Sequence, residues 1–546
     1  PDGSIAIIPE EWFTRYSPIF DFGKNDNDKI KIKKHHLELI EGIFDENKEK
    51  KSNYIEKKDD KSLPKGLKAE LRPYQIEGYQ WLINLKENKF GGCLADDMGL
   101  GKTLQVLSYF QHIKECETNN QNTFFSQMDL FQNEDIQRCS TSLVVVPTSL
   151  IYNWLREINH FTNLSVHIHT GFNRNKSIEK LMGNFDLIIT SYGTMRNDID
   201  MLKEFRFHTI ILDESQAIKN PSSLTAASVL KLKSEYKFAM TGTPVENSIT
   251  DLWSQLNFLN PDLLGNFNFF TKKYVHSIEK EKNEKDTLTL RNLVRPFILR
   301  RTKNQVASDL PIKTEQIRWC KMTPEQEKSY EKIKSTVRNE LIASVDKIGR
   351  NKSQLLVLQG LIKLRQLANH PKLIDSESEI SSGKFEIVTE MIEKVIESNH
   401  KVLVFSQFVK HLELYKGYFD NKGIKYHFLD GSITSINRKK LVDEFQSDES
   451  SGIFFISLKA GGVGLNLTAA DYVFLLDPWW NPAIERQAMD RTHRIGQNKP
   501  VFVYKFITSE SIEEKILKLQ NNKQKVSDNL IENEETLLKN LSQTEI

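Results

Sequence analysis

Runs of apolar and β-branched residues recur in two stretches of the chain, and segments with helical periodicity separate them. A buried parallel strand is continuously apolar because both of its faces are covered. Such runs lie at residues 92–95, 142–147, 185–190, 208–213 and 237–240, and again at 401–406, 425–429, 452–457, 472–477 and 501–505. Alternating strands and helices predict α/β architecture with doubly wound parallel sheets. We therefore expect two such sheets of similar size.

The remaining stretches have different patterns. Between residues 251 and 373 strands are expected to disappear, and helical spacing predicts a helix starting near Thr323 and a packed helix over 355–367. Helices are also predicted over 71–85 and 512–519, and the polar stretch 117–140 is expected to be a surface insertion. The expected division is a flanking segment with a charged linker (1–66), a first lobe (67–260), helical insertions and a linker (261–380), a second lobe (381–526) and a tail (527–546).

Composition narrows the class of protein. A chain of 546 residues is too long for one core, and a net charge of +2, from 75 basic and 73 acidic residues, means that any nucleic-acid surface must be local. Four cysteines without paired spacing argue against a zinc site or a disulfide framework and fit a reducing compartment. No apolar run reaches the ~18 residues of a membrane helix. Because the first residue is Pro1, we expect a fragment or a processed product.

A glycine loop follows the first apolar run. Residues 96–103 read Asp-Asp-Met-Gly-Leu-Gly-Lys-Thr and precede a helical pattern. Glycines let successive backbone N–H groups point at phosphate oxygens, and the helix directs its positive end to the same place. Lys102 would reach the β- and γ-phosphates, and the Thr103 hydroxyl would ligate Mg²⁺. Asp96 stands where the general pattern has its first glycine, so an ordinary glycine turn remains the alternative.

Two carboxylates end the run at 208–213. Ligands of an open α/β sheet bind at the carboxyl ends of its strands. Asp213 would hold Mg²⁺ through water, and Glu214 would orient or deprotonate an attacking water. The alternative is a solvated acidic pair that caps the next helix. The phosphate loop upstream and the Thr-Gly-Thr-Pro sequence at 241–244 favour the catalytic interpretation.

Three side chains elsewhere are candidates for nucleotide contacts. Gln75 offers an amide that can read an adenine edge, although a surface glutamine on an amphipathic helix is the alternative. Arg491 and Arg494 are three residues apart, which predicts that they share one side of a helix. Two guanidinium groups delivered to the γ-phosphate would stabilise the charge of phosphoryl transfer. The alternative is a surface helix with salt bridges.

Loops after two strands suit a nucleic-acid backbone. Residues 147–149, with Asn153 and Trp154, offer hydroxyls and amides, and the glycines at 461–464 allow close approach. Two adjacent tryptophans at 479–480 lie between prolines. We expect them to pack at an interface between lobes rather than to stack on a base.

Taken in order, these motifs resemble the Swi/Snf family of DNA-dependent ATPases within superfamily-two helicases. The resemblance covers residues 67–525 and includes Asp96, Asp-Glu-Ser-Gln at 213–216, Asp-Pro-Trp-Trp-Asn-Pro at 477–482 and Asp-Arg-Thr-His-Arg-Ile-Gly-Gln at 490–497. It implies two RecA-like doubly wound parallel-sheet lobes with helical insertions between them, with ATP between the lobes. The Trp12-Phe13 region, with no bromodomain- or chromodomain-like segment in view, looks more like the bacterial members. A bacterial member would be cytoplasmic and nucleoid-associated, and a eukaryotic one nuclear. One departure is Ser215-Gln216, where many members have Ala-His, and it puts the coupling of hydrolysis to DNA in doubt.

The resemblance also implies roles for individual residues. Catalytic roles fall to Lys102, Asp213, Glu214, Arg491 and Arg494, and metal binding to Thr103 and Asp213. ATP contacts are implied for Gln75, Asp97, Met98, Gly99, Leu100, Gly101, Lys102, Thr103 and Gln487. DNA contacts are implied for Pro147, Thr148, Trp154, Ser191, Tyr192, Gly461, Gly462 and Asn466.

The sequence thus predicts an ATP- and Mg²⁺-dependent translocase on double-stranded DNA that remodels or displaces a DNA-bound protein. A strand-separating DNA or RNA helicase with the same motor is one alternative, against which the helical block at 251–373 argues. A DNA-binding scaffold with a vestigial motor is another, against which the intact set of catalytic residues argues. No membrane partner is expected, and the sequence leaves the oligomeric state open.

Overall fold

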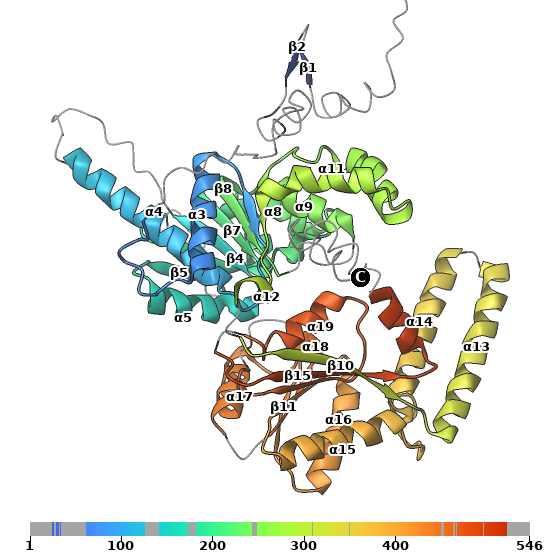
Figure 1. Cartoon of the computed structure of the whole chain (residues 1–546). Coiled ribbons are helices and arrows are strands. Elements are labelled where there is room, and N and C mark those ends of the chain that lie inside the picture. Colours follow the sequence, from blue (N-terminus) through green and yellow to red (C-terminus); the bar gives the residue numbers. More distant parts are fainter. Residues whose placement is uncertain are drawn as a thin grey trace, which may run out of the picture. The chain divides into compact units, whose positions relative to one another are not determined.

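The computed structural model describes residues 24–26, 29–31, 33, 36, 62–125, 141–171, 174, 182–242, 248–307, 310–348, 350–448, 452–461, 465, 467–494 and 496–520. The chain forms two compact lobes, and the first ends at Thr302 while the second begins at Lys303 (Figure 1). A short antiparallel hairpin, β1 (Lys24–Asp26) and β2 (Lys29–Lys31), precedes the first sheet in sequence.

The first lobe contains a seven-stranded sheet in which every described pair is parallel. Its order is β5-β6-β4-β7-β8-β3-β9. The strands are β3 (Gly92–Leu94), β4 (Ser142–Val146), β5 (Val166–His169), β6 (Leu187–Ser191), β7 (Arg206–Asp213), β8 (Lys233–Met240) and β9 (Ile298–Leu299). Every residue of β4 and β6 is buried, as expected of central strands covered on both faces.

Helices cover both faces of this sheet. They are α3 (Pro73–Glu87), α4 (Lys102–Phe125), α5 (Ile151–Phe161), α6 (Tyr192–Asn197), α7 (Ile199–Leu202), α8 (Leu224–Lys231), α9 (Ile249–Leu259), α10 (Phe267–Phe270) and α11 (Glu284–Val294). Shorter helical turns are η2 (Thr148–Leu150), η4 (Ser215–Ile218) and η6 (Arg295–Phe297), with a π-helix η5 (Thr271–Lys280). Figure 1 shows α3, α4 and α5 on one side of the sheet and α8, α9 and α11 on the other.

The second lobe contains a six-stranded parallel sheet in the order β10-β15-β14-β11-β13-β12. The strands are β10 (Lys313–Cys320), β11 (Val402–Ser406), β12 (Tyr426–Leu429), β13 (Ile453–Ser457), β14 (Tyr472–Leu475) and β15 (Val501–Thr508). Alternate residues of β11 enter opposite cores, Leu403 and Phe405 on one face and Val402 and Val404 on the other. This division is the two-residue period of a strand that is buried on both sides.

The helices of the second lobe include two long ones in its N-terminal part. They are α12 (Lys303–Val306), α13 (Pro324–Ile348), α14 (Arg350–Asn369), α15 (Gly383–Glu397), α16 (Val409–Asn421), α17 (Ser435–Ser447), α18 (Leu458–Gly461) and α19 (Pro482–Met489), with the turn η7 (Pro371–Leu373) and a C-terminal helix over 512–520. The predicted helix start near 323 and the predicted helix over 355–367 are confirmed by α13 and α14.

The expectation that strands disappear between 251 and 373 is wrong. β9 is only two residues long, which is too short for any periodicity, and it pairs with β3. β10 is an edge strand with mostly exposed side chains, so it has no apolar run to reveal it. Strand β5 was not predicted either, and α4 runs to Phe125, into the stretch expected to be a surface insertion.

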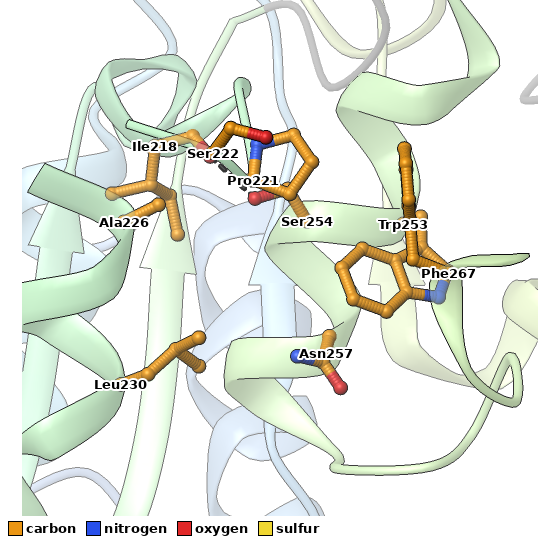
Figure 2. A pocket seen from close by; sticks show the side chains of 9 residues that line it. All are labelled: Ile218, Pro221, Ser222, Ala226, Leu230, Trp253, Ser254, Asn257 and Phe267. Carbon is orange, nitrogen blue, oxygen red and sulfur yellow. Dashed lines mark hydrogen bonds between the residues drawn. The ribbon is translucent and has the colours of Figure 1, made fainter. Parts of the chain in front are cut away.

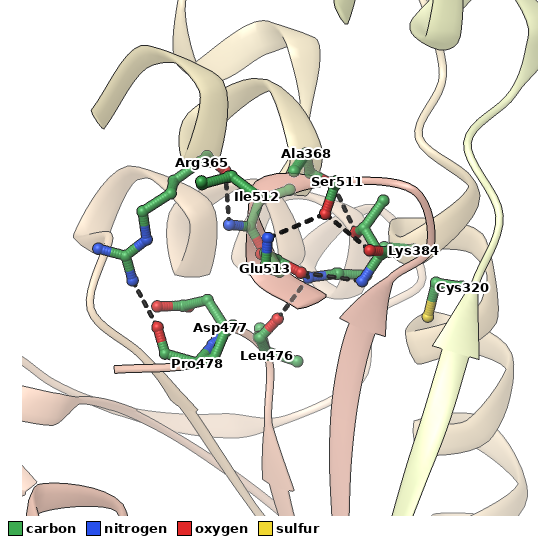
Figure 3. A network of polar contacts seen from close by, with 12 residues as sticks. Cys320, Arg365, Ala368, Lys384, Leu476, Asp477, Pro478, Ser511, Ile512 and Glu513 are labelled. Carbon is green, nitrogen blue, oxygen red and sulfur yellow. Dashed lines mark hydrogen bonds and ion pairs between the residues drawn. The ribbon is translucent and has the colours of Figure 1, made fainter. Parts of the chain in front are cut away.

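A buried ion pair fastens the C-terminal helix of the second lobe (Figure 3). The ammonium of Lys384 donates to Glu513 Oε2 at 2.7 Å, to Asn369 Oδ1 at 3.0 Å and to the Leu476 carbonyl at 2.8 Å. Both side chains of the ion pair are fully buried, and the backbone N–H of Thr508 also donates to Glu513 at 2.9 Å. This contact joins α14, α15, the end of β14 and the C-terminal helix within one lobe.

Within the described residues, no helix is both long enough and apolar enough to cross a bilayer.

Candidate active site

The loop between β3 and α4 has the predicted layout of strand, glycine loop and helix. Gly99 and Gly101 have φ angles of +88° and +77°, which an L-residue adopts only at a cost. Lys102 opens α4, and its Nζ donates to the carbonyl of Asp96 at 2.6 Å. A second acceptor, the Asp97 carbonyl, lies at 3.4 Å. The backbone therefore curls around the lysine, with the amino end of α4 directed at the loop, as phosphate binding requires.

Asp96, which departs from the general loop pattern, has a structural partner. Its carboxylate is fully buried and accepts hydrogen bonds from Arg301 Nε at 3.0 Å and Nη2 at 2.6 Å. Gln105, near the start of α4, also donates to it at 3.2 Å. The carboxylate is thus used inside the lobe, which explains why an acidic residue occupies a position that is usually glycine. The sequence showed the basic cluster at 295–303 but not its partner.

Asp213 ends β7 and is almost completely buried. Trp154 Nε1 donates to its Oδ2 at 2.8 Å, and the backbone N–H of Glu214 donates to Oδ1 at 2.9 Å. Burial and the adjacent charge of Glu214 raise the pKa of Asp213 to about 7, against the opposing effects of Trp154 and Lys102. A cation beside this carboxylate would favour its charged form, so Asp213 is suited to holding one.

Glu214 adopts a left-handed conformation, with φ of +50° and ψ of +55°. A non-glycine residue there costs about 1–2 kcal/mol, which its surroundings must offset. The side-chain amide of Gln216 donates to Glu214 Oε2 at 2.8 Å and accepts from Thr241 Oγ1 at 2.9 Å. One side chain therefore links the second carboxylate to the residue that follows β8. Residues 243 and 244, the second half of the predicted Thr-Gly-Thr-Pro motif, lie outside the described residues.

The sheet brings these groups to one edge. β8 lies between β7 and β3, so the carboxyl ends of the three strands are adjacent. The backbone N–H of Thr241 donates to the Leu94 carbonyl at 3.1 Å, and Lys102 is near enough to Asp213 to lower its pKa. The structure therefore assembles the loop, both carboxylates and Thr241 in one place, although 147 positions of sequence numbering separate Leu94 from Thr241.

Gln75 is not the surface glutamine of the alternative interpretation, because it is only 4% exposed. Its Oε1 accepts from the backbone N–H of Arg72 at 2.9 Å, and a Cβ added to Gly101 would lie 2.4 Å from its Nε2. The amide therefore lies directly against the phosphate loop. Its contact with adenine stays a prediction.

The candidate DNA residues of the first lobe are arranged around Asp213. Pro147 precedes η2 and Thr148 opens it as an exposed residue after β4. Ser191 caps α6 after β6, and the Tyr192 hydroxyl donates to the Asp213 carbonyl at 2.8 Å. Trp154 is 2% exposed, so the structure places its ring in the core against Asp213 rather than at the surface. Sequence reasoning had missed this link between Trp154 and the carboxylate.

In the second lobe, Gln487 lies buried on α19, and Gly461 ends α18 after β13. Gly462 and Asn466 lie outside the described residues. The predicted helix bearing Arg491 and Arg494 is wrong, because α19 ends at Met489 and both arginines follow it in turns.

Hydrogen bonds close the turn that follows that helix. The Met489 carbonyl accepts from the Thr492 hydroxyl at 2.8 Å and from the backbone N–H groups of Thr492 and His493 at 3.2 and 3.4 Å. The Gln497 amide donates to the Thr492 carbonyl at 3.2 Å. Arg491 is only 6% exposed, which also excludes the surface salt-bridge helix.

The two tryptophans pack within the second lobe. Trp479 lies against one of its two cores, and its backbone N–H donates to Glu485 at 2.8 Å. The guanidinium of Arg365 lies 5.5 Å from the centre of the Trp480 ring, and its Nη2 donates to the Pro478 carbonyl at 2.5 Å. Whether either ring also packs at a lobe interface stays a prediction.

A pocket of about 270 Å³ lies elsewhere in the first lobe (Figure 2). It lies between η4, α8 and α9, with Trp253 and Phe267 on one side and Ala226 and Leu230 on the other. None of the residues predicted to act in catalysis, in nucleotide binding or in DNA binding lines it.

Comparison with known proteins identifies the family. The model of the SNF2-related domain matches residues 74–373, and that of the helicase conserved C-terminal domain matches 383–496. A putative ATP-dependent helicase/translocase, YwqA of Bacillus subtilis, is 39% identical over 86% of this chain and 49% of its own length. The ATP-dependent DNA helicase DDM1 of Arabidopsis thaliana is 35% identical over 84% of this chain and 61% of its length. The chain thus spans about half to three-fifths of these relatives.

Among solved structures, the SWI2/SNF2 ATPase core of Sulfolobus solfataricus in complex with dsDNA is 34% identical. The match covers 87% of this chain and 95% of that chain, with a TM-score of 0.43. The SNF2-related model alone spans more than half of the sequence. The chain belongs to the SNF2 family of ATP-dependent helicase-like proteins, with an SNF2-related domain followed by a helicase C-terminal domain.

Proposed function

We propose that this protein is an ATP-dependent translocase on double-stranded DNA that remodels or displaces DNA-bound proteins. The observation that carries the proposal is the shared sheet edge of the first lobe, where the phosphate loop, Asp213, Glu214 and the Gln216–Thr241 link lie together. The names of two relatives, a putative ATP-dependent helicase/translocase and an ATP-dependent DNA helicase, support the same function.

The loop fits a nucleoside triphosphate. Two glycines with positive φ leave room for phosphates against the backbone, and a Cβ at Gly101 would meet Gln75. Lys102 would neutralise the β- and γ-phosphates. Gln75, whose amide lies beside the loop, would bind the base. Thr103 would offer its hydroxyl to Mg²⁺ and Asp213 would hold the ion through water, which are the hard oxygen donors that this ion prefers. Mg²⁺, when bound, would neutralise charge on the phosphate oxygens.

Glu214 would orient the attacking water and accept its proton. Its carboxylate is held by Gln216, so it does not swing freely, and this fixed orientation is what a general base needs. We propose that Arg491 and Arg494 of the second lobe supply positive charge to the γ-phosphate, an effect worth about 10³–10⁵ in rate in related phosphoryl transfers. Gln487 contributes to the same nucleotide site.

We propose that duplex DNA contacts the segments at the carboxyl ends of β4, β6 and β13. The residues are Pro147 and Thr148, Ser191 and Tyr192, and Gly461, Gly462 and Asn466. Hydroxyls, backbone amides and glycines suit contacts with phosphates, which contribute binding energy without recognising the base sequence. Tyr192 supports a link between this surface and the carboxylate, because its hydroxyl donates to the Asp213 carbonyl. Trp154 would act through Asp213 and not through DNA, since its ring is buried.

The test is the steady-state ATPase rate without nucleic acid and with duplex DNA, single-stranded DNA or RNA, at stated salt. Translocation is then followed by displacement of a triplex-forming strand and of streptavidin from biotinylated duplex. We expect duplex DNA to stimulate hydrolysis most and to support displacement, and Lys102→Ala and Glu214→Gln to abolish both. Unwinding of a forked duplex, or stimulation by single strands alone, would replace the translocase with a strand-separating helicase. Parent-rate hydrolysis by Lys102→Ala would refute the proposed site.

A further inference from the structure

Two buried cations flank the point where the chain passes from the first lobe to the second. Arg301 and Lys303 are 7% and 6% exposed, and the lobe boundary falls between Thr302 and Lys303. A buried charge is costly unless it is paired and hydrogen-bonded. Each cation finds its partner in a different catalytic motif, and each pairing lies within one lobe.

Arg301 is built into the phosphate loop. The ladder between β3 and β9 continues past the strands, with Ala95 N–H donating to the Leu299 carbonyl at 2.7 Å and Asp97 N–H to the Arg301 carbonyl at 2.9 Å. The backbone N–H of Arg301 donates to Asp96 Oδ1 at 3.1 Å, in addition to the two guanidinium bonds. The first residues of the loop are therefore fixed along their length by residues 299–301.

The same guanidinium reaches both helices beside the loop. It donates to Gln105 Oε1 on α4 at 2.9 Å and to the Tyr74 carbonyl on α3. Gly78 of α3 lies against these hydrogen-bonded side chains. A Cβ at this position would be 1.8 Å from Gln105 Oε1, so a larger residue would displace Gln105. One planar, forked group thus ties together the two helices and the loop, a geometry that lysine does not reproduce.

Lys303 holds the turn that carries Arg491 and Arg494, as Arg301 holds the phosphate loop. Its Nζ donates to Asp490 Oδ1 at 2.6 Å and also to the His493 carbonyl. Asp490 immediately precedes Arg491, and His493 immediately precedes Arg494. His493 Nε2 is also hydrogen-bonded to the Pro311 carbonyl at 2.8 Å. The turn is therefore held by Lys303 and by the Pro311 carbonyl, and not by a continuing helix.

We propose that Arg301 and Lys303 are positioning residues for ATP hydrolysis: Arg301 fixes the phosphate loop through Asp96, and Lys303 fixes the arginine turn through Asp490 and the His493 carbonyl. This inference rests on the proposed function for the reaction it serves. Because the phosphate loop holds nucleotide throughout the cycle whereas the arginines act on charge in the transition state, the two cations have separable effects.

The experiment uses the full chain with Arg301→Lys, Arg301→Met, Asp96→Asn, Lys303→Met and Lys303→Arg. Arg295→Met is the matched control, an exposed residue of the same basic cluster. Binding of a fluorescent ADP analogue with Mg²⁺ is measured apart from turnover. kcat and KM for ATP are measured at saturating duplex DNA, and thermal unfolding checks that each variant is folded.

We expect Arg301→Met and Asp96→Asn to weaken ADP binding by about 10–100-fold, as a misplacement of about 1 Å does at such sites. Lys303→Met should leave ADP affinity within about twofold of the parent and lower kcat by about 10–100-fold, since misplaced arginines lose part of their effect in the transition state. Lys303→Arg should restore much of kcat, while Arg301→Lys should restore little ADP affinity. If Arg301→Met does not fold, Arg301→Lys and Asp96→Asn carry that half of the test.

Equal losses of ADP affinity and kcat in the two series, or no loss in folded variants, would overturn the inference. A parent protein that hydrolyses no ATP would instead refute the proposed function. In that case ADP binding still tests the role of Arg301.

Discussion

At the scale of single residues, the site depends on groups whose charge is controlled by neighbours. Asp213 is buried beside Glu214, and both effects raise its pKa, while Trp154 and Lys102 oppose the rise. Asp96 is equally buried but is paired with a guanidinium. Two buried carboxylates beside the nucleotide loop thus have different roles, because one has a permanent cationic partner and the other is suited to a transient one.

The raised pKa of Asp213 predicts that the stability of the first lobe depends on pH. Its folded pKa of about 7 lies above the ordinary value of 3.8, so its stabilising contribution is complete below about pH 4 and is lost as pH rises through about 7. Asp213→Asn should therefore gain stability relative to the nucleotide-free parent between about pH 4 and pH 8, by on the order of a few kcal/mol at most. Chemical denaturation of both proteins across that range measures the difference. A stability difference that stays constant with pH would contradict the assignment, and Glu214→Gln, which removes the neighbouring charge, should reduce the slope.

The contacts of Gln216 predict that a substitution there affects the coupling of hydrolysis to DNA but not nucleotide binding. Its amide links Glu214 to Thr241 by two hydrogen bonds, one to each residue. Gln216→Ala should keep nucleotide affinity but reduce DNA-stimulated kcat by about tenfold, because Glu214 loses part of the orientation that a general base needs. The measurement is ATPase with and without duplex DNA. Asn220→Ala, an exposed neighbour, is the control, and an unchanged stimulation by DNA in Gln216→Ala would exclude the coupling role.

At the scale of elements, the positions of loops at strand ends decide the chemistry. β3, β8 and β7 are adjacent and parallel, so the residues that follow them meet at one sheet edge. Short elements matter as much as long ones: the two residues of β9 align Arg301 with Asp96, and the end of α19 at Met489 frees the arginines from a helix. An element that stops early can place a side chain where a regular one would not.

The phosphate loop predicts a contrast between two glycines with similar backbones. Gly101 has φ of +77° and a Cβ there would lie 2.4 Å from Gln75, whereas Gly171 has φ of +83° with nothing within 4 Å. Both alanine variants should lose about 1 kcal/mol of stability from the left-handed conformation alone. Only Gly101→Ala should also lower affinity for ATP, by at least about tenfold, because the loop must shift. Equal ATP affinities in the two variants would argue that the loop does not hold nucleotide.

The buried pair Lys384–Glu513 predicts a lobe-specific loss of stability. Lys384→Met leaves the fully buried Glu513 without its cation, which costs about 3–5 kcal/mol when one partner of such a pair is removed. The double variant Lys384→Met, Glu513→Leu should recover a large part, because no charge then remains buried. Unfolding followed by hydrogen exchange, lobe by lobe, should show the change in the second lobe only. A double variant no better than the single would mean that the pair does not carry the effect.

At the scale of the whole molecule, charge is balanced and binding surfaces are local. A net charge of +2 creates no overall electric field that would attract DNA to the protein. The residues proposed to touch DNA are uncharged, and several of them carry hydroxyl or amide groups. Because each lobe supplies part of the proposed machinery, neither a phosphate loop alone nor an arginine turn alone would suffice. Arg301 anchors one end of the connection between the lobes through Asp96 of the first lobe, and Lys303 anchors the other end through Asp490 of the second lobe.

This distribution predicts a moderate dependence of DNA binding on salt. Each Lys or Arg that neutralises a phosphate contributes about −0.9 to the slope of log affinity against log salt. No Lys or Arg is among the residues proposed to touch DNA, so the slope for duplex DNA should be shallower than about −5. Titrations between about 50 and 300 mM salt measure this slope. A slope of about −8 or steeper would mean that a basic surface outside the proposed loops dominates binding.

The fold class, the two sheets and the nucleotide motifs were all predictable from local sequence patterns. Continuous apolar runs of this length, alternating with helical patterns, are typical of buried parallel strands, and a strand followed by Gly-x-Gly-Lys-Thr and a helix is typical of a phosphate loop. These signals are local, because periodicity and motif spacing depend on neighbours in the chain. For this reason Lys102, Thr103, Asp213 and Glu214 could be proposed without a structure.

The hydrogen-bonding partners of the buried charged groups depend on how the chain packs. Arg301 and Asp96 are 205 positions apart, and nothing in the local sequence around either residue pairs them. The same holds for Trp154 with Asp213, and for Lys303 with Asp490. β10 was not predicted because an exposed edge strand has no apolar run. The end of α19 was not predicted because the turn that follows it is held by Lys303, which is distant in the sequence. Burial and pairing at long range depend on the packed chain, which periodicity does not encode.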